Sequence, residues 1–266
     1  MKNRLTITSG FKNQRSYLKD TFFTPPFRVA NISEHRSDPA LYLMVMSSSP
    51  GMLDGDEYKI DIVVEEGSRL QLHSQSYQRL FNMQKGAVQL QSIQLHPGSS
   101  FSYVQHPVVP HENAIFKGRN RIDVSDNCRL TFGEILTCGR KHSGEIFRYS
   151  SYHNITEIYH NGKLMIKDNL LLQPSLVNMA AIGQMEGYTH QATLFHLNTH
   201  SGIDVDNVNM LYELLGEEKD VAIGISSPSP KVLAVRILGN GGEQLFSCLQ
   251  RIAAYFWTIE KNALVS

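Results

Sequence analysis

Three segments align with one another without gaps: Ile62–Gln75 (IVVEEGSRLQLHSQ), Ile93–His106 (IQLHPGSSFSYVQH) and Ile122–Ile135 (IDVSDNCRLTFGEI). Each begins as an alternating strand, reaches a Gly or Asn where a turn needs a positive φ, and continues as a second alternating strand. The copies start 31 and 29 residues apart. Repeats of this length are typical of stacked supersecondary units. The pattern predicts a mainly β fold with a coiled or stacked, β-helix-like sheet, and an ordinary β-sandwich is the alternative.

Alternating segments surround the repeats and extend the predicted β-rich body over residues 1–200. Tyr58–Val64 and Ala87–Gln91 alternate apolar with polar residues, as half-buried strands do. The strongest turn signal is Asn161-Gly162, because this dipeptide supplies the positive φ angles of a two-residue hairpin. A hairpin is therefore predicted between Glu157–His160 and Lys163–Asp168.

The last part of the chain, residues 201–266, is predicted to contain two α-helices. Asp204 is a suitable N-cap for a helix over Val205–Leu215, with Gly216 as its C′ residue. A second helix is predicted over Gly241–Glu260, with an apolar stripe made of Leu245, Leu249, Ile252, Ala253 and Phe256. Strands are expected between the helices, around Val221–Ile225 and Val232–Leu238. No long linker interrupts the chain, so residues 1–266 are expected to form a single domain.

The charge balance bears on possible partners. Lys plus Arg and Asp plus Glu each number 25, so no overall positive field exists to hold nucleic-acid phosphates. Charged residues make up 19% of the chain, below the ~25% of an average soluble domain. The composition argues against a nucleic-acid partner and hints at a surface that other proteins cover.

The cysteines and the apolar runs indicate a cytoplasmic protein. Cys128, Cys138 and Cys248 are widely spaced and odd in number, which argues against a disulfide framework or a zinc site and favours buried, reduced thiols. Residues 1–24 are mixed and polar, unlike a signal sequence. The longest apolar run, Leu41–Met46, is far shorter than the ~18 residues needed to span a bilayer. No membrane association is expected.

Common catalytic motifs are absent from the sequence, which has no phosphate-binding loop, nucleophile elbow, His-Glu-x-x-His or dinucleotide fingerprint. Histidines are the main chemical signal. His96, His106 and His111 flank prolines and could converge as weak metal ligands, although hydrogen-bonded histidines are the more common occurrence. His190, His196 and His200 share one strand parity but are spaced too widely for one metal.

Two readings of function follow from these residues. One is a β-rich metal-dependent enzyme that uses the three proline-flanking histidines with Glu112. The other is a hydrated path for a divalent ion, lined by acidic residues on turns. Asp56 follows the Asp54-Gly55 turn, and Glu134 and Glu145 bracket Arg140. Oxygen ligands bind such an ion without trapping it. In the alternative, purely structural interpretation, Asp56 caps backbone amides and Arg140 pairs with a neighbouring carboxylate.

Five motifs occur in an order and spacing that resemble the urease accessory protein family UreD, also called UreH. They are Thr24-Pro25-Pro26-Phe27, Ser49–Asp56 (SPGMLDGD), Ser74-Gln75-Ser76, Pro107–Ala114 (PVVPHENA), and Gly133-Glu134 through Gly139-Arg140 to Gly144–Phe147. The closing segment Val232–Trp257 is also similar. Met52 stands where the family often has a second glycine.

The resemblance implies a mainly β urease maturation factor that is not an enzyme. It implies that the protein binds apo-urease and a UreF-type accessory protein, and through the latter a UreG-type GTPase, so that nickel reaches the urease centre. Nickel would be transient cargo passing through an internal tunnel, with no tightly bound cofactor. By this resemblance Asp56 and Glu134, with polar Ser74, Gln75 and Ser76 and basic Arg140, would line or support the path.

Overall fold

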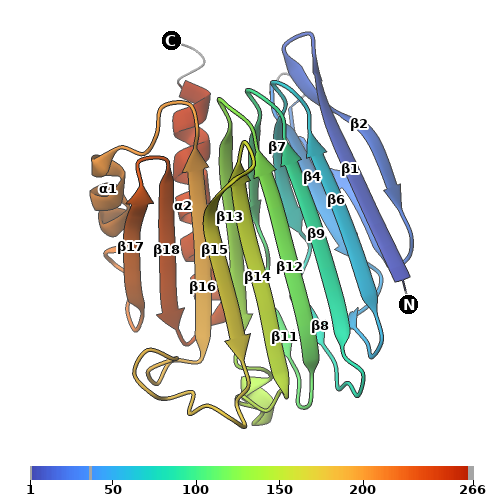
Figure 1. Ribbon diagram of the computed structural model, residues 1–266, viewed down its shortest axis with the longest axis vertical. Coiled ribbons are helices and arrows are strands. Elements are labelled where there is room, and N and C mark those ends of the chain that lie inside the picture. Colours follow the sequence, from blue (N-terminus) through green and yellow to red (C-terminus); the bar gives the residue numbers. More distant parts are fainter. Residues whose placement is uncertain (1, 36–37, 263–266) are drawn as a thin grey trace.

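Two large β-sheets and two α-helices make up the parts of the chain described by the computed structural model, residues 2–35 and 38–262 (Figure 1). In spatial order the first sheet contains β15 (Lys163–Leu172), β14 (Ser151–His160), β12 (Ile115–Val124), β9 (Ala87–Leu95), β6 (Glu57–Val64), β1 (Lys2–Lys12) and β2 (Arg15–Phe23). The second contains β17 (Ala222–Ser229), β18 (Val232–Gly239), β16 (His190–Asn198), β13 (Arg129–Thr137), β10 (Ser100–Val104), β7 (Arg69–Ser74), β4 (Leu41–Ser47) and β3 (Phe27–Asn31). The short strands β5 (Gly51–Met52), β8 (Gln78–Leu80) and β11 (Val108–Pro110) join the second sheet. The mainly β prediction is confirmed.

The three sequence repeats form successive turns of a parallel β-coil. Each repeat supplies one strand to the first sheet and the next strand to the second. Ile62 pairs with Ile93, and Ile93 pairs with Ile122, in parallel register. The strands β7, β10 and β13 are likewise parallel neighbours. The gap-free sequence alignment therefore matches the strand register, and the stacked coil, not a simple sandwich, is confirmed.

Tight turns between the sheets have the backbone that the sequence predicts. Gly67, Gly98 and Asn127 occupy equivalent turn positions, with φ of 68°, 72° and 58°. Glycine reaches this left-handed region without a steric penalty, and asparagine is among the few other residues that tolerate it.

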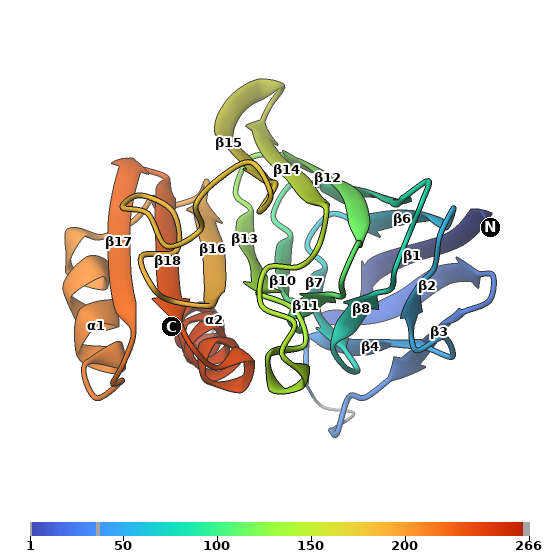
Figure 2. The same cartoon turned by 90° about the horizontal axis from the view of Figure 1, so that it is seen from below.

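Antiparallel strands end the coil on its C-terminal side. β14 and β15 form the predicted hairpin, with Asn161 at φ 48° and Gly162 at φ 78°. The following strand β16 pairs antiparallel with β13, and β18 and β17 extend that sheet beyond the first one (Figure 2).

Helix α1 (Val205–Leu215) has the predicted bounds and the predicted Asp204 N-cap. Gly216, however, is not a left-handed C′ residue: its φ is −62°, because the helix closes with a tightened bond from the Gly216 amide to the Glu213 carbonyl. Helix α2 (Gly242–Asn262) lies against the outer face of the second sheet (Figure 2). Its predicted apolar stripe is buried, Phe256 included, and Trp257 is buried as well.

Candidate functional site

The interior of the coil has two chemically different halves. Near the tight turns, the inward-facing side chains of the first sheet are aliphatic, and we call this region the apolar half: Ile62, Ile93, Ile122, Ile158, Val64, Leu95 and Val124. Toward the other end of the same strands the inward positions carry amides and a hydroxyl. We call this region the polar half: Gln89, Gln91, Asn120, Asn154 and Thr156 from the first sheet, with Glu134 from the second.

Strand β9 shows why the polar half points inward. Its inward set also includes Ile93 and Leu95, which fix the parity of the strand in the core. Gln89 and Gln91 are therefore buried, whereas Leu90 is 40% exposed. A half-buried strand that followed its own alternation over Ala87–Gln91 would have buried Leu90 instead. Stacking with the neighbouring coils outweighs the local pattern.

Glu134 is the carboxylate of the polar half. It shares its face of β13 with Leu130 and Phe132, and its oxygens accept hydrogen bonds from neutral donors on the first sheet. Asn120 Nδ2 donates at 2.9 Å, Asn154 Nδ2 at 3.0 and 3.1 Å, and Thr156 Oγ1 at 2.8 Å. Among the described residues, the Glu134 carboxyl group is therefore held by neutral dipoles and forms no ion pair with a cation.

Burial raises the pKa of Glu134, and the bonds from Thr156, Asn154 and Asn120 offset part of that rise. Burial and, secondarily, the Glu134 charge also raise the pKa of the Tyr103 hydroxyl. A cation that approached Glu134 would relieve the cost of its buried charge, so the polar half is suited to receive a positive ion.

A second carboxylate stands near Glu134 at the edge of the coil. Asp168 on β15 adds to the rise in the Glu134 pKa, but forms its own ion pair with Arg236 on β18. This pair connects the edge hairpin of the first sheet with the extended part of the second sheet.

A cavity of about 100 Å³ lies between the sheets in the direction of β5 and β8. Ser74, Gln75 and Ser76 line it, together with Gln89 and Gln105. The Ser74-Gln75-Ser76 motif therefore shares one space with Gln89 of the polar half. Among the described residues, both amide atoms of Gln91 and the amide nitrogen of Gln105 are buried without a hydrogen-bond partner. Buried groups of this kind call for water or another polar occupant.

Asp56 lies outside that cavity, on the turn before β6. Its Oδ2 accepts the Leu53 amide at 2.9 Å, so it caps the turn as the structural interpretation predicted. Position 51, in the same motif, requires glycine because the backbone of β8 lies close to it: a Cβ at Gly51 would lie 2.3 Å from the Arg79 carbonyl oxygen. Met52 is fully buried in the core, so a side chain fits at this second position.

Arg140 lies outside the coil interior that contains Glu134. It forms an ion pair with Glu145 through Nε–Oε2 at 2.9 Å and a second contact from its NH2 group. The predicted pairing with a neighbouring carboxylate is confirmed, with Glu145 as the partner. Arg140 and His111 line a separate open cavity beside the start of α2.

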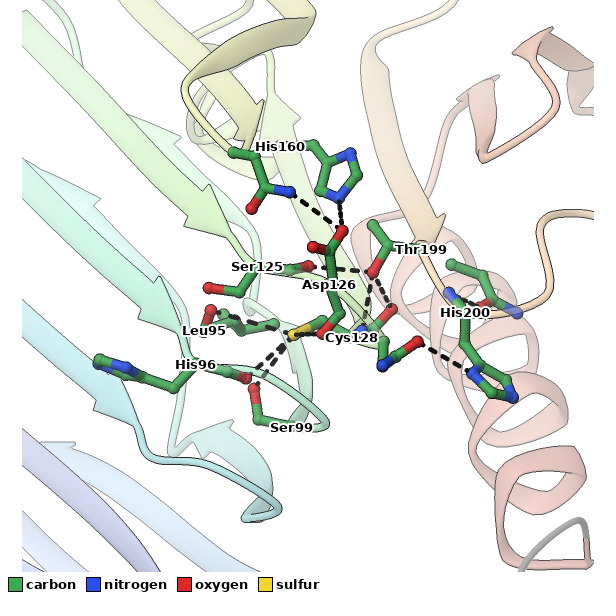
Figure 3. A network of polar contacts seen from close by, with 12 residues as sticks. Leu95, His96, Ser99, Ser125, Asp126, Cys128, His160, Thr199 and His200 are labelled. Atoms are coloured by element: carbon green, nitrogen blue, oxygen red, sulfur yellow. Dashed lines mark hydrogen bonds and ion pairs between the residues drawn. The ribbon is translucent and has the colours of Figure 1, made fainter.

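The three proline-flanking histidines do not converge. His96 and His106 lie at opposite ends of β10. His106 accepts or donates a 2.8 Å bond with Ser74 and stacks on Phe246, whereas His111 contacts the ring edge of Phe81. Figure 3 shows the ring of His96 pointing away from the turn network that surrounds Cys128. The proposed His/Glu enzyme site is not assembled, and contact of any single histidine with nickel stays a prediction.

The turn network of Figure 3 is structural in its contacts. The Cys128 thiol donates to the His96 carbonyl at 3.0 Å, and Asp126 accepts from His160 at 2.9 Å. All three cysteines are buried, as predicted. On β16, His190 and His196 share one face as expected, whereas His200 lies beyond the end of the strand.

Across the described ranges, 2–35 and 38–262, no group of three or more His, Cys, Asp or Glu side chains is arranged to hold a metal ion. Over the same residues, no helix has the length and apolarity to cross a membrane. The sequence motifs predict a role for Glu134 but give no indication of its hydrogen-bond partners Asn120, Asn154 and Thr156. Asn120 and Thr156 lie two residues before Ile122 and Ile158 on their strands, so strand alternation places them on the same inward face and could have identified them.

Comparison with known proteins gives a consistent result along the whole chain. The family model described as "UreD urease accessory protein" matches residues 2–264. A urease accessory protein UreD from Flavobacterium johnsoniae is 57% identical over 264 residues, covering 98% of this chain and 95% of that protein. The UreD of Acetivibrio thermocellus is 34% identical, covering 94% and 95%, and that of Haemophilus influenzae is 33% identical, covering 95% and 97%.

Proposed function

Because this chain belongs to the UreD family of urease accessory proteins, we propose that it delivers nickel to apo-urease through the polar half of its β-coil. Membership assigns it a role in urease maturation and makes it an accessory protein, not an enzyme. We further propose that it acts in a complex with a UreF-type protein, a UreG-type GTPase held through that protein, and apo-urease. Nickel is cargo in this scheme, and no cofactor is tightly bound.

The observation that supports the route is the continuous set of polar side chains inside an otherwise apolar coil. It begins at the cavity lined by Ser74, Gln75 and Ser76, where Gln78 Nε2 donates to Gln89 Oε1 at 2.9 Å. It continues through Gln91 to Asn120, which are register neighbours, and reaches Glu134.

The ligand chemistry of this set suits transfer. Amide and hydroxyl oxygens with a single carboxylate form a weaker site for a first-row divalent ion than thiolates and imidazoles do. Weak, successive oxygen contacts favour movement of the ion over retention. The free-energy cost of removing water from the ion is offset by negative charge, which Glu134 supplies on this route. We therefore assign Glu134 the central position.

The test co-expresses the chain with urease subunits and UreF- and UreG-type partners, and measures complex formation, urease nickel content and urease activity. Glu134→Gln keeps the size of the side chain and removes its charge; we expect complexes to form and urease nickel content to fall at least several-fold. Glu66→Gln makes the same change at an exposed turn residue and serves as the control.

Wild-type nickel content with Glu134→Gln in intact complexes would show the route to be wrong. Asp56→Ala tests the remaining predicted carboxylate: a normal nickel content would restrict Asp56 to capping its turn. Failure of the wild-type chain to co-purify with any partner would instead contradict the scaffold role.

A further inference from the structure

An open cavity of about 710 Å³ lies at the start of α2, and the proposed nickel route does not use it. It lies between the 3₁₀ turn Lys141–Ser143, strands β8 and β11, and the segment Asn240–Glu243. It is separate from the 100 Å³ interior cavity, although Tyr77 lines both.

Cationic side chains dominate the charge of this cavity. Arg79, Arg140 and Lys141 line it, and Arg140 is already paired with Glu145. Among the described residues, Arg79 and Lys141 form no ion pair; the Lys141 ammonium contacts the Thr189 hydroxyl at 3.5 Å and the Asn240 carbonyl at 3.3 Å. Glu243, the acidic residue of the lining, interacts with the Tyr77 hydroxyl. Two positive charges therefore remain without a carboxylate.

The backbone adds to this positive potential. Asn240, Gly241, Gly242 and Glu243 border the cavity, and α2 begins at Gly242. The first amides of a long helix carry partial positive charge and have no acceptor within the helix. A Cβ at Gly242 would lie 2.8 Å from the Tyr77 hydroxyl oxygen, so glycine keeps this backbone close to the cavity wall.

One buried polar atom in the lining is also unexplained. His111 is 7% exposed, and within the described part of the chain its Nε2 has no hydrogen-bond partner. The ring is held by the edge contact with Phe81 at a centroid distance of 4.8 Å. His111 lies in the wall of the cavity, and a small movement of its ring would let Nε2 donate to a bound acceptor.

We propose that this cavity binds an oxyanion, a carboxylate or phosphate, between Arg79, Lys141 and the first turn of α2, with His111 in its wall. Guanidinium, ammonium and helix amides are the usual donors to both groups. Tyr77, Phe81 and Val109 give the same wall an apolar component, so the ligand carries an apolar or aromatic group beside its anion.

The test uses the purified full chain without metal or partners. Isothermal titration and histidine NMR follow the addition of phenyl phosphate, benzoate and inorganic phosphate at an ionic strength held constant with sodium chloride. We expect saturable binding of phenyl phosphate or benzoate, with the stronger of the two identifying the anionic group, and shifts in the His111 ring signals. Inorganic phosphate measures the contribution of the anion alone.

Arg79→Gln and Lys141→Gln should each weaken this binding at least tenfold, whereas Lys117→Gln, an exposed cation on the outer face of β12, should change it less than twofold. Both substituted residues are solvent-accessible and outside the core, and thermal unfolding checks that each variant is folded. Absence of saturable binding by all three probes, or equal binding by wild type and both variants, would overturn the proposal. Neither result bears on nickel delivery, because no metal is present.

Discussion

The two halves of the coil interior are formed by the same strands and differ only in the residues at their inward positions. In the apolar half, Ile62, Ile93 and Ile122 stack in register, each at most 1% exposed. In the polar half, two residues away on β9, Gln91 is 3% exposed and has amide atoms without partners. Stability is therefore concentrated in the apolar half. The polar half buries amide groups without partners, which lowers stability and is not needed for a purely structural role. The following changes test that division.

The largest expected effect is in the apolar half. Ile93→Ala removes a fully buried side chain between two stacked isoleucines and should lower the free energy of unfolding by about 2–5 kcal/mol. Urea denaturation measures this loss. At temperatures where the variant is folded, urease nickel content should stay normal; a selective loss of nickel delivery would contradict the division.

A smaller effect is expected from Gly118→Ala in the polar half. A Cβ at Gly118 would lie 2.2 Å from Asn154 Oδ1, so the Asn154 amide has to leave the position in which it contacts Glu134. Overpacking of this kind typically costs about 1–3 kcal/mol. Denaturation should show the loss, and a crystal structure should show a lengthened Asn154–Glu134 contact. Gly224→Ala, where a Cβ would meet only the Arg236 carbonyl oxygen at 3.9 Å, controls for glycine replacement.

The pH dependence of stability should identify Glu134. Its pKa is raised by burial above the ordinary 4.5, so the folded state holds this proton more tightly than the unfolded state. The resulting stabilisation is fully present below 4.5 and is lost as pH rises through the raised pKa. Stability of the wild type should therefore fall more steeply than that of Glu134→Gln from pH 4.5 upward. Parallel profiles would show that Glu134 ionises normally.

The smallest effect on stability is expected from Gln91→Leu. The substitution removes a buried amide that has no partner among the described residues and keeps a similar volume, so unfolding free energy should change by less than about 1 kcal/mol. Nickel delivery, by contrast, should fall, because the route loses a polar step. Gln94→Leu, on the exposed face of the same strand, should leave both quantities unchanged. Normal delivery by Gln91→Leu would remove Gln91 from the route.

Much of the coil could be predicted from sequence because its signals are local or repeated. The spacing of Ile62, Ile93 and Ile122 gives the strand register directly, and Gly67 and Gly98 mark the turns. Asn161-Gly162 and Asp204 identify a hairpin and a helix start in the same way.

The polar half could be predicted only in part. Glu134 follows from a motif, but the inward direction of Gln89 and Gln91 depends on the neighbouring coils and contradicts the alternation of their own strand. The motifs group Arg140 and Asp56 with Glu134, yet in the fold Asp56 caps the turn before β6 and Arg140 pairs with Glu145 beside another cavity. Sequence order does not carry that information.

The hydrogen bonds around Glu134 also have an order in time. Asn120 precedes Glu134 in the chain, whereas Asn154 and Thr156 follow it by 20 and 22 residues. During synthesis from the N-terminus, β13 is therefore complete before two of the three residues that hold its carboxylate have been made. Until β14 and β16 have been made, β12 and β13 each present an unpaired strand edge, and Glu134 lacks Asn154 and Thr156.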